Sequence, residues 1–366
     1  MSVSHSQRRR VIARKTALAA IAGPLVASAL LPIAASAATY RPTPLNPKQK
    51  VSVGLLNSTS DSGLLLAADH GYFTDEGLDI ELVPFKSLSD MFPLLGRGQL
   101  DVGAGGVAAG LFNAAARGIP LKIVADKGHM PGPRGKGDDY STLMVRKDLV
   151  QTGKIRKYAD LKGTKIALVG GPGSIGEFAV AKALANGNLT LKDVTTISMT
   201  YPDLVPAFAN GAVDAAILIE PFQTFIQTQG TGVIWKTYTD LFGHANQIAV
   251  IVYGDSFAAK KEPARRFMIA YLRGVRDYND AFGPKHASYN DVVNVLARDT
   301  HQKAQIFDEV RAPGIDPDGN LALQSLQEQV AYYTRAGEIT AKVDLNAVTD
   351  TSFSNFAVSQ LGHYRR

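Results

Sequence analysis

The stretch KIALVGGPGSIGEFAVAKAL, residues 165–184, decides the fold of this chain. A short apolar run ends in a glycine-rich turn and is followed by a longer apolar pattern, which is typical of a strand that leads into a helix. The segments VTTISMTY (194–201) and FANGAVDAAILIEP (208–221) add a second strand, another helix and a third strand. Strands that alternate with helices in this way predict a mostly parallel sheet covered by helices on both faces.

The same order of elements occurs earlier in the chain. Residues 50–106 contain KVSVGLL, LDIELVPF and LLGRGQLDVGAGG in the corresponding places. Three pairs of markers are separated by nearly constant offsets of 115, 116 and 113 residues: Lys50 and Lys165, Phe85 and Tyr201, and Gly98 and Gly211. This repeat predicts two similar α/β lobes. Because open sheets of this kind bind ligands beyond the carboxyl ends of their strands, we expect the lobes to enclose a cleft.

Composition limits the class of partner. The 366 residues suit two α/β domains, and the net charge of +6 is concentrated in residues 1–37, which hold five Lys and Arg and no acid. The remainder has 34 Lys and Arg against 33 Asp and Glu. A body so near neutrality argues against nucleic acid as a partner, because phosphate binding needs clustered positive charge. The absence of cysteine excludes disulfides, thiolate metal sites and a cysteine nucleophile.

Residues 1–37 have the pattern of an export signal peptide. A basic start precedes the apolar run ALAAIAGPLVASALLPIAA, and Ala35-Ser36-Ala37 forms a small-x-small cleavage site, so we expect cleavage after Ala37. Arg8 and Arg9 favour a twin-arginine signal, and a general secretory signal is the alternative. Residues 38–49 are expected to form an extended leader.

Hydroxyl and glycine residues follow the predicted strands of the first lobe. Ser58 and Thr59 come after the first strand, Ser87 comes after the second, and Gly106 ends the third. Hydroxyls in such loops either cap the helix that follows or hold the oxygen atoms of a ligand, and both interpretations stay open.

Residues 171–176, GPGSIG, match the G-x-G-x-x-G pattern of dinucleotide sites. The interpretation is disfavoured because Asp193 precedes the next strand instead of ending it. The helix start at Gly173 and Ser174 offers amides and a hydroxyl to a small anion or polar ligand. A hydrolase nucleophile at Ser174 is set aside because Pro172 replaces the first glycine of that motif. The seven histidines lack metal-ligand spacing, so no metal site is expected. No cofactor is expected either.

Phe85 and Tyr201 occupy equivalent strand ends, where two aromatic rings can sandwich a planar ligand. Glu220 ends the third strand of the second lobe and either joins the lobes by an ion pair, binds a ligand amine or faces solvent. Residues 127–140, KGHMPGPRGKGDDY, read as a polar surface loop or a lid. No arginine occurs in the other loops assigned to the cleft, so dipoles and hydroxyls are expected to hold an anionic ligand.

Taken in order, VGLLNSTSDSGLLLAADHGYFTDEGLDIELV (53–83), LLGRGQLDVGAGG, AAARGIPLKIVA, DLKGTKIALVGGPGSIGE and FANGAVDAAILIEP resemble the solute-binding proteins of the nitrate/sulfonate/taurine and thiamine-pyrimidine type. The resemblance implies a type II periplasmic binding fold, with two α/β lobes, mixed and mostly parallel sheets, and two hinge strands. The first lobe is expected to span 50–140 plus 251–366, and the second 141–250. Carried over by position, the expected ligand residues are Ser58, Thr59, Ser87, Gly106, Gly173, Ser174, Tyr201 and Glu220, with Phe85 opposite Tyr201.

The resemblance also implies a function without catalysis. The protein is expected to be a periplasmic monomer that binds a sulfonate, aromatic carboxylate or pyrimidine-like ligand and delivers it to the membrane permease of an ABC importer. The alternative is an exported enzyme on the same fold that uses Ser174 or Glu220. The yeast-like pyrimidine synthases of this fold use a cysteine-rich motif that the chain lacks.

Overall fold

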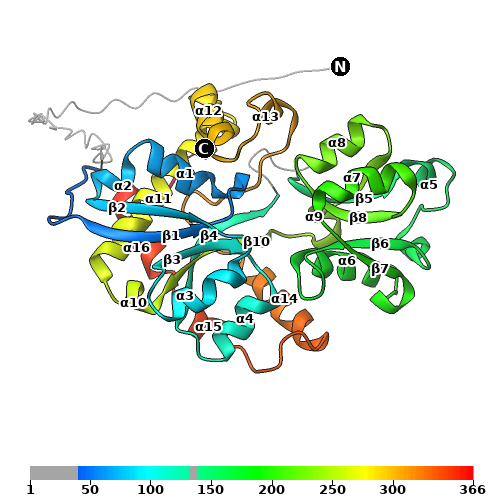
Figure 1. The fold of residues 1–366 in the computed structure, drawn as a ribbon, viewed down its shortest axis with the longest axis horizontal. Coiled ribbons are helices and arrows are strands. Elements are labelled where there is room, and N and C mark those ends of the chain that lie inside the picture. The colour runs from blue at the N-terminus through cyan, green and yellow to red at the C-terminus, as the bar shows by residue number, and fades with distance from the viewer. Residues whose placement is uncertain (1–39, 132–138, 366) are drawn as a thin grey trace, which may run out of the picture. The chain divides into compact units, whose positions relative to one another are not determined.

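The computed structural model describes residues 40–131 and 139–365, which contain two five-stranded sheets (Figure 1). The first sheet has the spatial order β2 (Leu78–Pro84), β1 (Gln49–Leu55), β3 (Val102–Gly106), β10 (Asn246–Gly254), β4 (Leu121–Met130). The second has the order β7 (Thr195–Met199), β6 (Lys165–Val169), β8 (Ala215–Ile219), β5 (Ser141–Arg146), β9 (Gly232–Thr237). We call the first sheet with its helices lobe I and the second sheet with its helices lobe II.

The two sheets share one topology. In each, a single strand runs antiparallel to its neighbours, β10 in lobe I and β5 in lobe II, and the other four strands are parallel to one another. Each antiparallel strand is the one that the chain forms directly after crossing from the other lobe. The predicted fold class, two α/β lobes with mixed and mostly parallel sheets, is confirmed.

A repeated turn explains why both halves of the sequence fold alike. Gly98 and Gly211 adopt positive φ values of 67° and 73°, a conformation that favours glycine. Three residues later, the carboxylates of Asp101 and Asp214 accept backbone N–H groups of β1 and β6, at 3.0 and 2.9 Å. The predicted G-x-(Leu/Val)-Asp turn therefore ties β3 to β1 in lobe I and β8 to β6 in lobe II.

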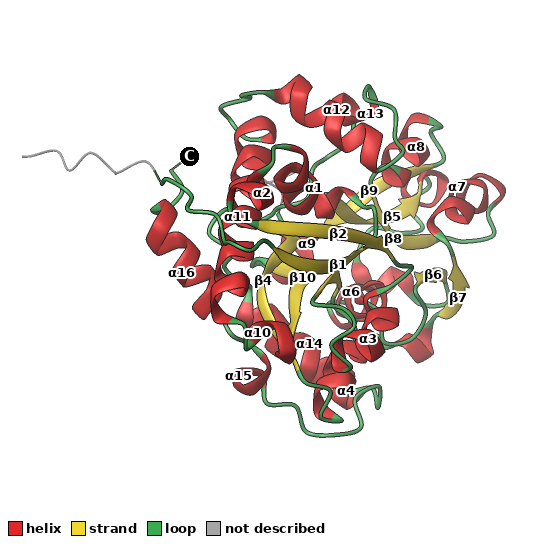
Figure 2. Ribbon diagram, turned by 60° about the vertical axis from the view of Figure 1, so that its left-hand side comes forward, coloured by secondary structure: helices red, strands yellow, loops and turns green. Residues whose placement is uncertain are grey.

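Helices cover both faces of the first sheet. On one side lie α1 (Ser62–Asp69), α11 (Lys261–Phe282) and α16 (Ser352–Leu361), and on the other lie α3 (Phe92–Gly96), α4 (Ala109–Ala116) and α14 (Leu323–Arg335) (Figure 2). The other helices of lobe I are α2 (Tyr72–Asp75), α10 (Asp255–Ala258), α12 (Tyr289–Asp299), α13 (Ile306–Glu309) and α15 (Leu345–Val348). The predicted apolar stripe of α11 is buried as expected: Phe267, Tyr271, Val275, Tyr278 and Phe282.

Lobe II has five α-helices among the described residues. They are α5 (Lys147–Gln151), α6 (Ile175–Ala185), α7 (Tyr201–Asn210), α8 (Phe222–Thr228) and α9 (Tyr238–Phe242). The residues that decided the fold form β6 and α6, with Ser174 at the N-cap of α6.

Several predictions concern residues outside the described part of the chain. The signal peptide at 1–37, its cleavage after Ala37, and residues 132–138 of the polar loop all lie there. The expected leader is described from Tyr40, whose hydroxyl donates to Glu76 at 2.8 Å. The lobe limits at 140/141 and 250/251 stay predictions, and the second falls inside β10. In residues 40–131 and 139–365, no helix combines the length and apolar character needed to cross a membrane.

Candidate functional site

Two of the predicted hydroxyl groups cap helices. Ser87 Oγ accepts the Asp90 N–H at 3.3 Å and donates to the Asp90 carboxylate at 2.9 Å, at the start of a 3-10 turn (Leu88–Met91). Ser174 Oγ accepts the Glu177 N–H at 3.1 Å at the start of α6. These contacts satisfy free backbone amides, which is the first of the two interpretations that the sequence left open. Their role toward a ligand stays a proposal.

Gly173 forms a direct backbone contact between the lobes. Its carbonyl oxygen accepts the N–H of Ala109, at the start of α4, at 2.9 Å. Its own N–H donates to the carboxylate of Glu177 at 3.3 Å, so this amide already has an acceptor inside the protein. Gly106 ends β3 three residues before Ala109 and lies opposite Ala249 of β10.

The contact at Gly173 leads to a first prediction. Gly173 has a φ of 74°, and a Cβ there would lie 3.1 Å from the Cβ of Ala109. Gly243 has a φ of 75° with nothing within 4 Å, so it is a matched control. Both glycine-to-alanine variants are expected to lose about 1–2 kcal/mol of unfolding free energy from the left-handed backbone. Only Gly173→Ala is expected to weaken ligand binding as well, measured by titration calorimetry. Equal affinities for the two variants would contradict a role of this contact in closing the two lobes around a ligand.

Aromatic side chains gather at the lobe II strand ends. Tyr201 stacks on Phe222 with a centroid separation of 5.7 Å and an interplanar angle of 12°. Burial raises the pKa of Tyr201 to about 12, so its phenol is neutral at physiological pH. Phe85 is half-buried against the lobe I core, and no ring contact joins it to Tyr201 in the described residues. The predicted sandwich of a planar ligand between Phe85 and Tyr201 stays a proposal.

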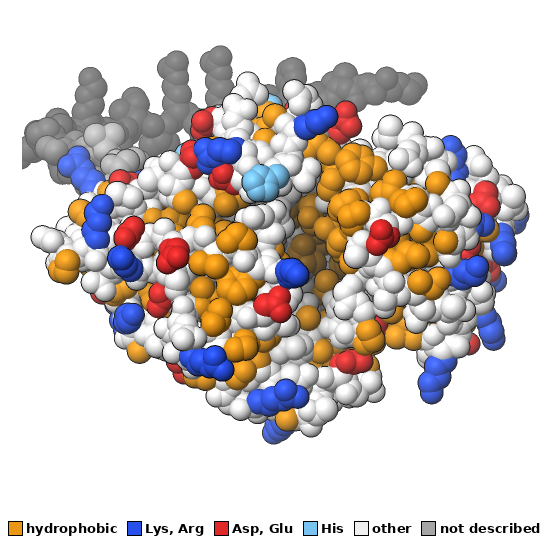
Figure 3. Space-filling view, viewed as in Figure 1, with side chains coloured by type: hydrophobic (Ala, Val, Ile, Leu, Met, Phe, Trp, Pro, Cys, Tyr) orange, Lys and Arg blue, Asp and Glu red, His pale blue; other side chains and the backbone are white. Residues whose placement is uncertain are grey.

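Tyr140 connects the two sides of the site. It is buried, and burial raises the pKa of its phenol far above the usual range. The neighbouring Tyr201, Glu220 and Asp61 add to this rise in pKa, in that order, so Tyr140 lies within electrostatic reach of a lobe I loop and a lobe II strand end. Figure 3 shows a hollow between the lobe I and lobe II elements of Figure 1, bordered by hydrophobic side chains.

An ion pair that the sequence did not reveal spans the lobes. Glu220 is buried, and its Oε1 accepts from Arg311 Nη1 at 3.1 Å and from the Arg311 backbone N–H at 3.2 Å. Gln223 Nε2 donates to the same oxygen at 2.7 Å. The Arg311 side chain is 29% exposed, and in the described parts of the chain its Nε and Nη2 groups have no hydrogen-bond partner. Of the three roles considered for Glu220, the structure shows the ion pair between lobes.

The polar loop predicted at 127–140 begins later than expected. Lys127 and His129 belong to β4, because pairing with β10 continues to Met130. Lys127 is fully buried, and its Nζ lies 2.9 Å from Asp61 Oδ1, whose side chain is also fully buried. The interpretation of Lys127 as a solvated loop residue is therefore wrong. The apolar pattern of the sequence ends at Asp126. The strand continues because its last residues pair with β10, about 120 residues later in the chain, and the local sequence does not reveal that pairing.

Asn246 has an unsatisfied side-chain amide. It is the first residue of β10, directly after the second crossing, and its side chain is 0% exposed. Neither its Oδ1 nor its Nδ2 has a hydrogen-bond partner within residues 40–131 and 139–365. A buried amide without partners costs free energy, and such groups often serve binding.

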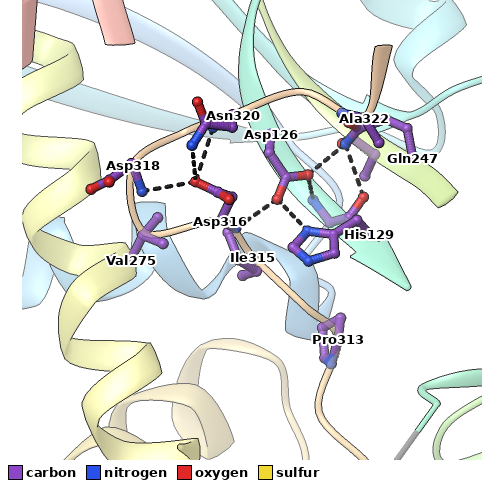
Figure 4. A network of polar contacts seen from close by, with 12 residues as sticks. Asp126, His129, Gln247, Val275, Pro313, Ile315, Asp316, Asp318, Asn320 and Ala322 are labelled. Carbon is purple, nitrogen blue, oxygen red and sulfur yellow. Dashed lines mark hydrogen bonds and ion pairs between the residues drawn. The ribbon is translucent and has the colours of Figure 1, made fainter. Parts of the chain in front are cut away.

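A polar network fixes the strands where the chain crosses (Figure 4). Asp126 of β4 is fully buried; its Oδ1 accepts from Gly128 N and Gln247 Nε2, and its Oδ2 accepts from His129 Nδ1 at 2.7 Å and Asp316 N at 2.6 Å. Gln247 belongs to β10, and Asp316 lies five residues after Arg311. One carboxylate therefore joins both strands to the loop that carries Arg311.

The described residues show no group of three or more His, Asp and Glu side chains placed to hold a metal ion. The two α/β lobes, each with a mixed five-stranded sheet, have a type II periplasmic binding protein fold. Residues 58–281 match the NMT1/THI5-like family, and the chain belongs to this family, which confirms the predicted resemblance.

Individual relatives fall into two functional classes. A Bacillus subtilis protein named as an aliphatic sulfonates-binding protein is 25% identical over 325 residues, 85% of this chain and 89% of its own. The crystal structure of the periplasmic aliphatic sulphonate-binding protein SsuA from Escherichia coli has a TM-score of 0.66 at 20% identity, covering 82% of this chain and 91% of that one. An enzyme, the 4-amino-5-hydroxymethyl-2-methylpyrimidine phosphate synthase of Schizosaccharomyces pombe, is 27% identical over 160 residues, 44% of this chain and 41% of its own.

Proposed function

We propose that this protein is the solute-binding component of an ABC importer, and that it closes its lobes on a small organic anion and delivers it unchanged to a membrane permease. The B. subtilis and E. coli relatives, which are named for sulfonate binding, support this proposal. The observation that carries it is Arg311, a cation of lobe I that is held by a buried carboxylate of lobe II and keeps unused donors.

The geometry of Arg311 suits a carboxylate or sulfonate. Glu220 occupies Nη1, so the edge formed by Nε and Nη2 is free to donate two parallel hydrogen bonds to an oxyanion. The stacked rings of Tyr201 and Phe222 supply apolar surface on the lobe II side. A ligand that touches both lobes favours the closed state by its additional contacts. We therefore favour a sulfonate or aromatic carboxylate over an uncharged pyrimidine-like compound.

A thermal-shift screen tests the proposal. Alkanesulfonates, aromatic carboxylates, pyrimidines and nitrate are compared at equal concentration. A ligand at one hundred times its dissociation constant stabilises the folded protein by about 2.7 kcal/mol, which raises the melting temperature measurably. Organic anions are expected to stabilise the protein, and the absence of a shift with every anion would refute the proposed ligand class.

Asn246 gives a second prediction, because replacing it is expected to raise the stability of the fold and to lower the affinity for the ligand. Asn246→Leu removes a buried amide that lacks protein partners, so the unfolding free energy is expected to rise by about 1 kcal/mol. If the amide serves the ligand, affinity falls in the same variant. Urea unfolding and calorimetric titration measure the two effects. A variant that is less stable than the wild type would show that the amide is satisfied in solution.

An exported enzyme on the same fold is the second candidate, and the S. pombe relative favours it. Its expected residues are engaged in structural contacts: Ser174 caps α6, and Glu220 pairs with Arg311 and Gln223. Incubating the protein with each ligand from the screen and analysing the mixture by mass spectrometry distinguishes the two functions. Turnover would establish the enzyme, whereas recovery of the unchanged ligand supports transport.

Location and partners are part of the same proposal. We propose a periplasmic monomer whose mature chain begins at Ala38. The N-terminal sequence of the exported protein tests the start at Ala38, and its mass in solution tests the monomeric state. Retention of residues 1–37, or a dimer at micromolar concentration, would contradict this part.

A further inference from the structure

Four polar side chains at the start of α1 form a closed ring of contacts, which we call the serine ladder: Lys127, Ser60, Ser58 and Asp61. Lys127 Nζ donates to Ser60 Oγ at 2.7 Å, Ser60 Oγ lies 3.0 Å from Ser58 Oγ, and Ser58 Oγ donates to Asp61 Oδ2 at 2.9 Å. The ion pair between Asp61 and Lys127 closes the ring at 2.9 Å.

The charged groups of Lys127 and Asp61 fix the direction of both serine hydroxyl protons. An ammonium only donates and a carboxylate only accepts. Ser58 has one proton and gives it to the charged acceptor Asp61, the stronger of its two possible bonds. Ser60 accepts from Lys127 and must therefore give its own proton to Ser58. Both serine protons are thus used inside the ladder.

Ser58 consequently faces a ligand only as an acceptor. It is half-buried, whereas Ser60, Asp61 and Lys127 are buried, so Ser58 is the member of the ladder that a bound molecule can reach. Its oxygen has accepted one hydrogen bond and keeps one lone pair. A ligand carboxylate or sulfonate would meet this lone pair without a proton between them, which is repulsive.

The ladder lies close to the loop that carries Arg311. A Cβ on Gly128 would be 3.4 Å from Ser60 Cβ, and the next residue, His129, pairs with Gly314 through two backbone hydrogen bonds of 2.8 and 3.0 Å. Gly314 follows Arg311 by three residues. The buried Tyr140 lies within electrostatic reach of both Asp61 and Glu220, since both carboxylates help to raise the pKa of its phenol.

Resting on the proposed function, we infer that the ligand is bipolar: it carries an anionic group for Arg311 and a hydrogen-bond donor, such as a hydroxyl, amide or ammonium, for Ser58. Ser58 is a specificity-determining residue, and Asp61 fixes its proton by accepting it. The ladder thus selects against organic anions whose far end is apolar or only accepts hydrogen bonds.

Matched ligands test the inference by calorimetric titration. One series is 4-hydroxybenzoate, 4-methoxybenzoate and 4-methylbenzoate; the other is 2-hydroxyethanesulfonate, 2-methoxyethanesulfonate and propane-1-sulfonate. In the series that binds, the hydroxyl compound is expected to bind about tenfold more tightly than the other two, the effect of one net hydrogen bond. The methoxy compound separates donation from acceptance. Equal affinities within a series would overturn the inference.

Three variants locate the effect. Ser58→Ala is expected to reduce the tenfold preference to about one. Ser60→Ala is expected to keep the preference, because Ser58 still donates to Asp61. Thr190→Ala is the matched control, since Thr190 donates to Asp193 in an equivalent cap on an exposed turn. A preference that survives Ser58→Ala would overturn the assignment. If no member of either series binds, the proposed function fails and the inference fails with it.

Discussion

Replacement of Arg311 by methionine is expected to weaken the binding of organic anions at least about thirtyfold. The variant removes the only side chain described here that both bridges the lobes by an ion pair and keeps free donors. Truncating one partner of a buried, hydrogen-bonded charge pair costs about 2–5 kcal/mol of binding free energy, which corresponds to a factor of 30 to several thousand. Calorimetric titration with the anion selected by the thermal-shift screen measures the loss.

The single variant also leaves the Glu220 carboxylate buried, so a loss of stability accompanies it. The double variant Glu220→Gln/Arg311→Met removes both charges and is expected to recover stability but not affinity. Arg311→Lys keeps the charge without the planar donor edge and is expected to bind with intermediate affinity. Arg335→Met, on the exposed end of α14, serves as the control. Wild-type affinity in the double variant would refute the assignment of Arg311 to the ligand.

Asp126→Asn is expected to destabilise the fold by about 3 kcal/mol. Asp126 accepts four hydrogen bonds, two on each carboxylate oxygen (Figure 4). An asparagine has one acceptor oxygen, so in either orientation its NH2 group faces a backbone N–H, that of Gly128 or that of Asp316, and bonds to a charged acceptor contribute about 1.5–3 kcal/mol each. Urea unfolding of the whole chain measures the change.

The same variant tests the link between the crossing strands and the ligand site. Because Asp316 and Arg311 lie on one loop, we expect Asp126→Asn to weaken anion binding even at temperatures where the variant is fully folded. Asp79→Asn, an exposed substitution at the start of β2, is expected to change neither stability nor affinity. If Asp126→Asn is as stable as the wild type, the four contacts do not persist in solution.

The fold was predictable because its signals are local. Apolar strands followed by glycine turns, and the two G-x-(Leu/Val)-Asp turns, carry their information within a few residues, and Gly98 and Gly211 adopt the backbone conformation that such turns need. The apolar stripe of α11 was predictable for the same reason, since helical periodicity is visible in the sequence alone.

The site was less accessible because it is assembled from distant segments. Arg311 lies in a loop without periodicity, between helices that were assigned to core packing. Lys127 and Asp61 are 66 residues apart and meet only when β4 and α1 are both in place. The glycine, proline and aspartate residues at 313–319 are a signal for an ordered loop, but they do not indicate which side chain enters the site. Ser58, Ser87 and Ser174 were predicted by position, whereas the direction of their hydroxyl protons required the structure.

The place of β10 has a consequence for how the chain matures. All five strands of the second sheet come from residues 141–237, whereas the first sheet lacks its antiparallel strand until residue 254 has been made. A polypeptide that emerges amino terminus first therefore completes the later half of its architecture before the earlier half. Until then, β3 and β4 expose unpaired edges. A general secretory route would carry the chain across the membrane unfolded, so the sheet would be completed outside, whereas a twin-arginine route would carry it already complete.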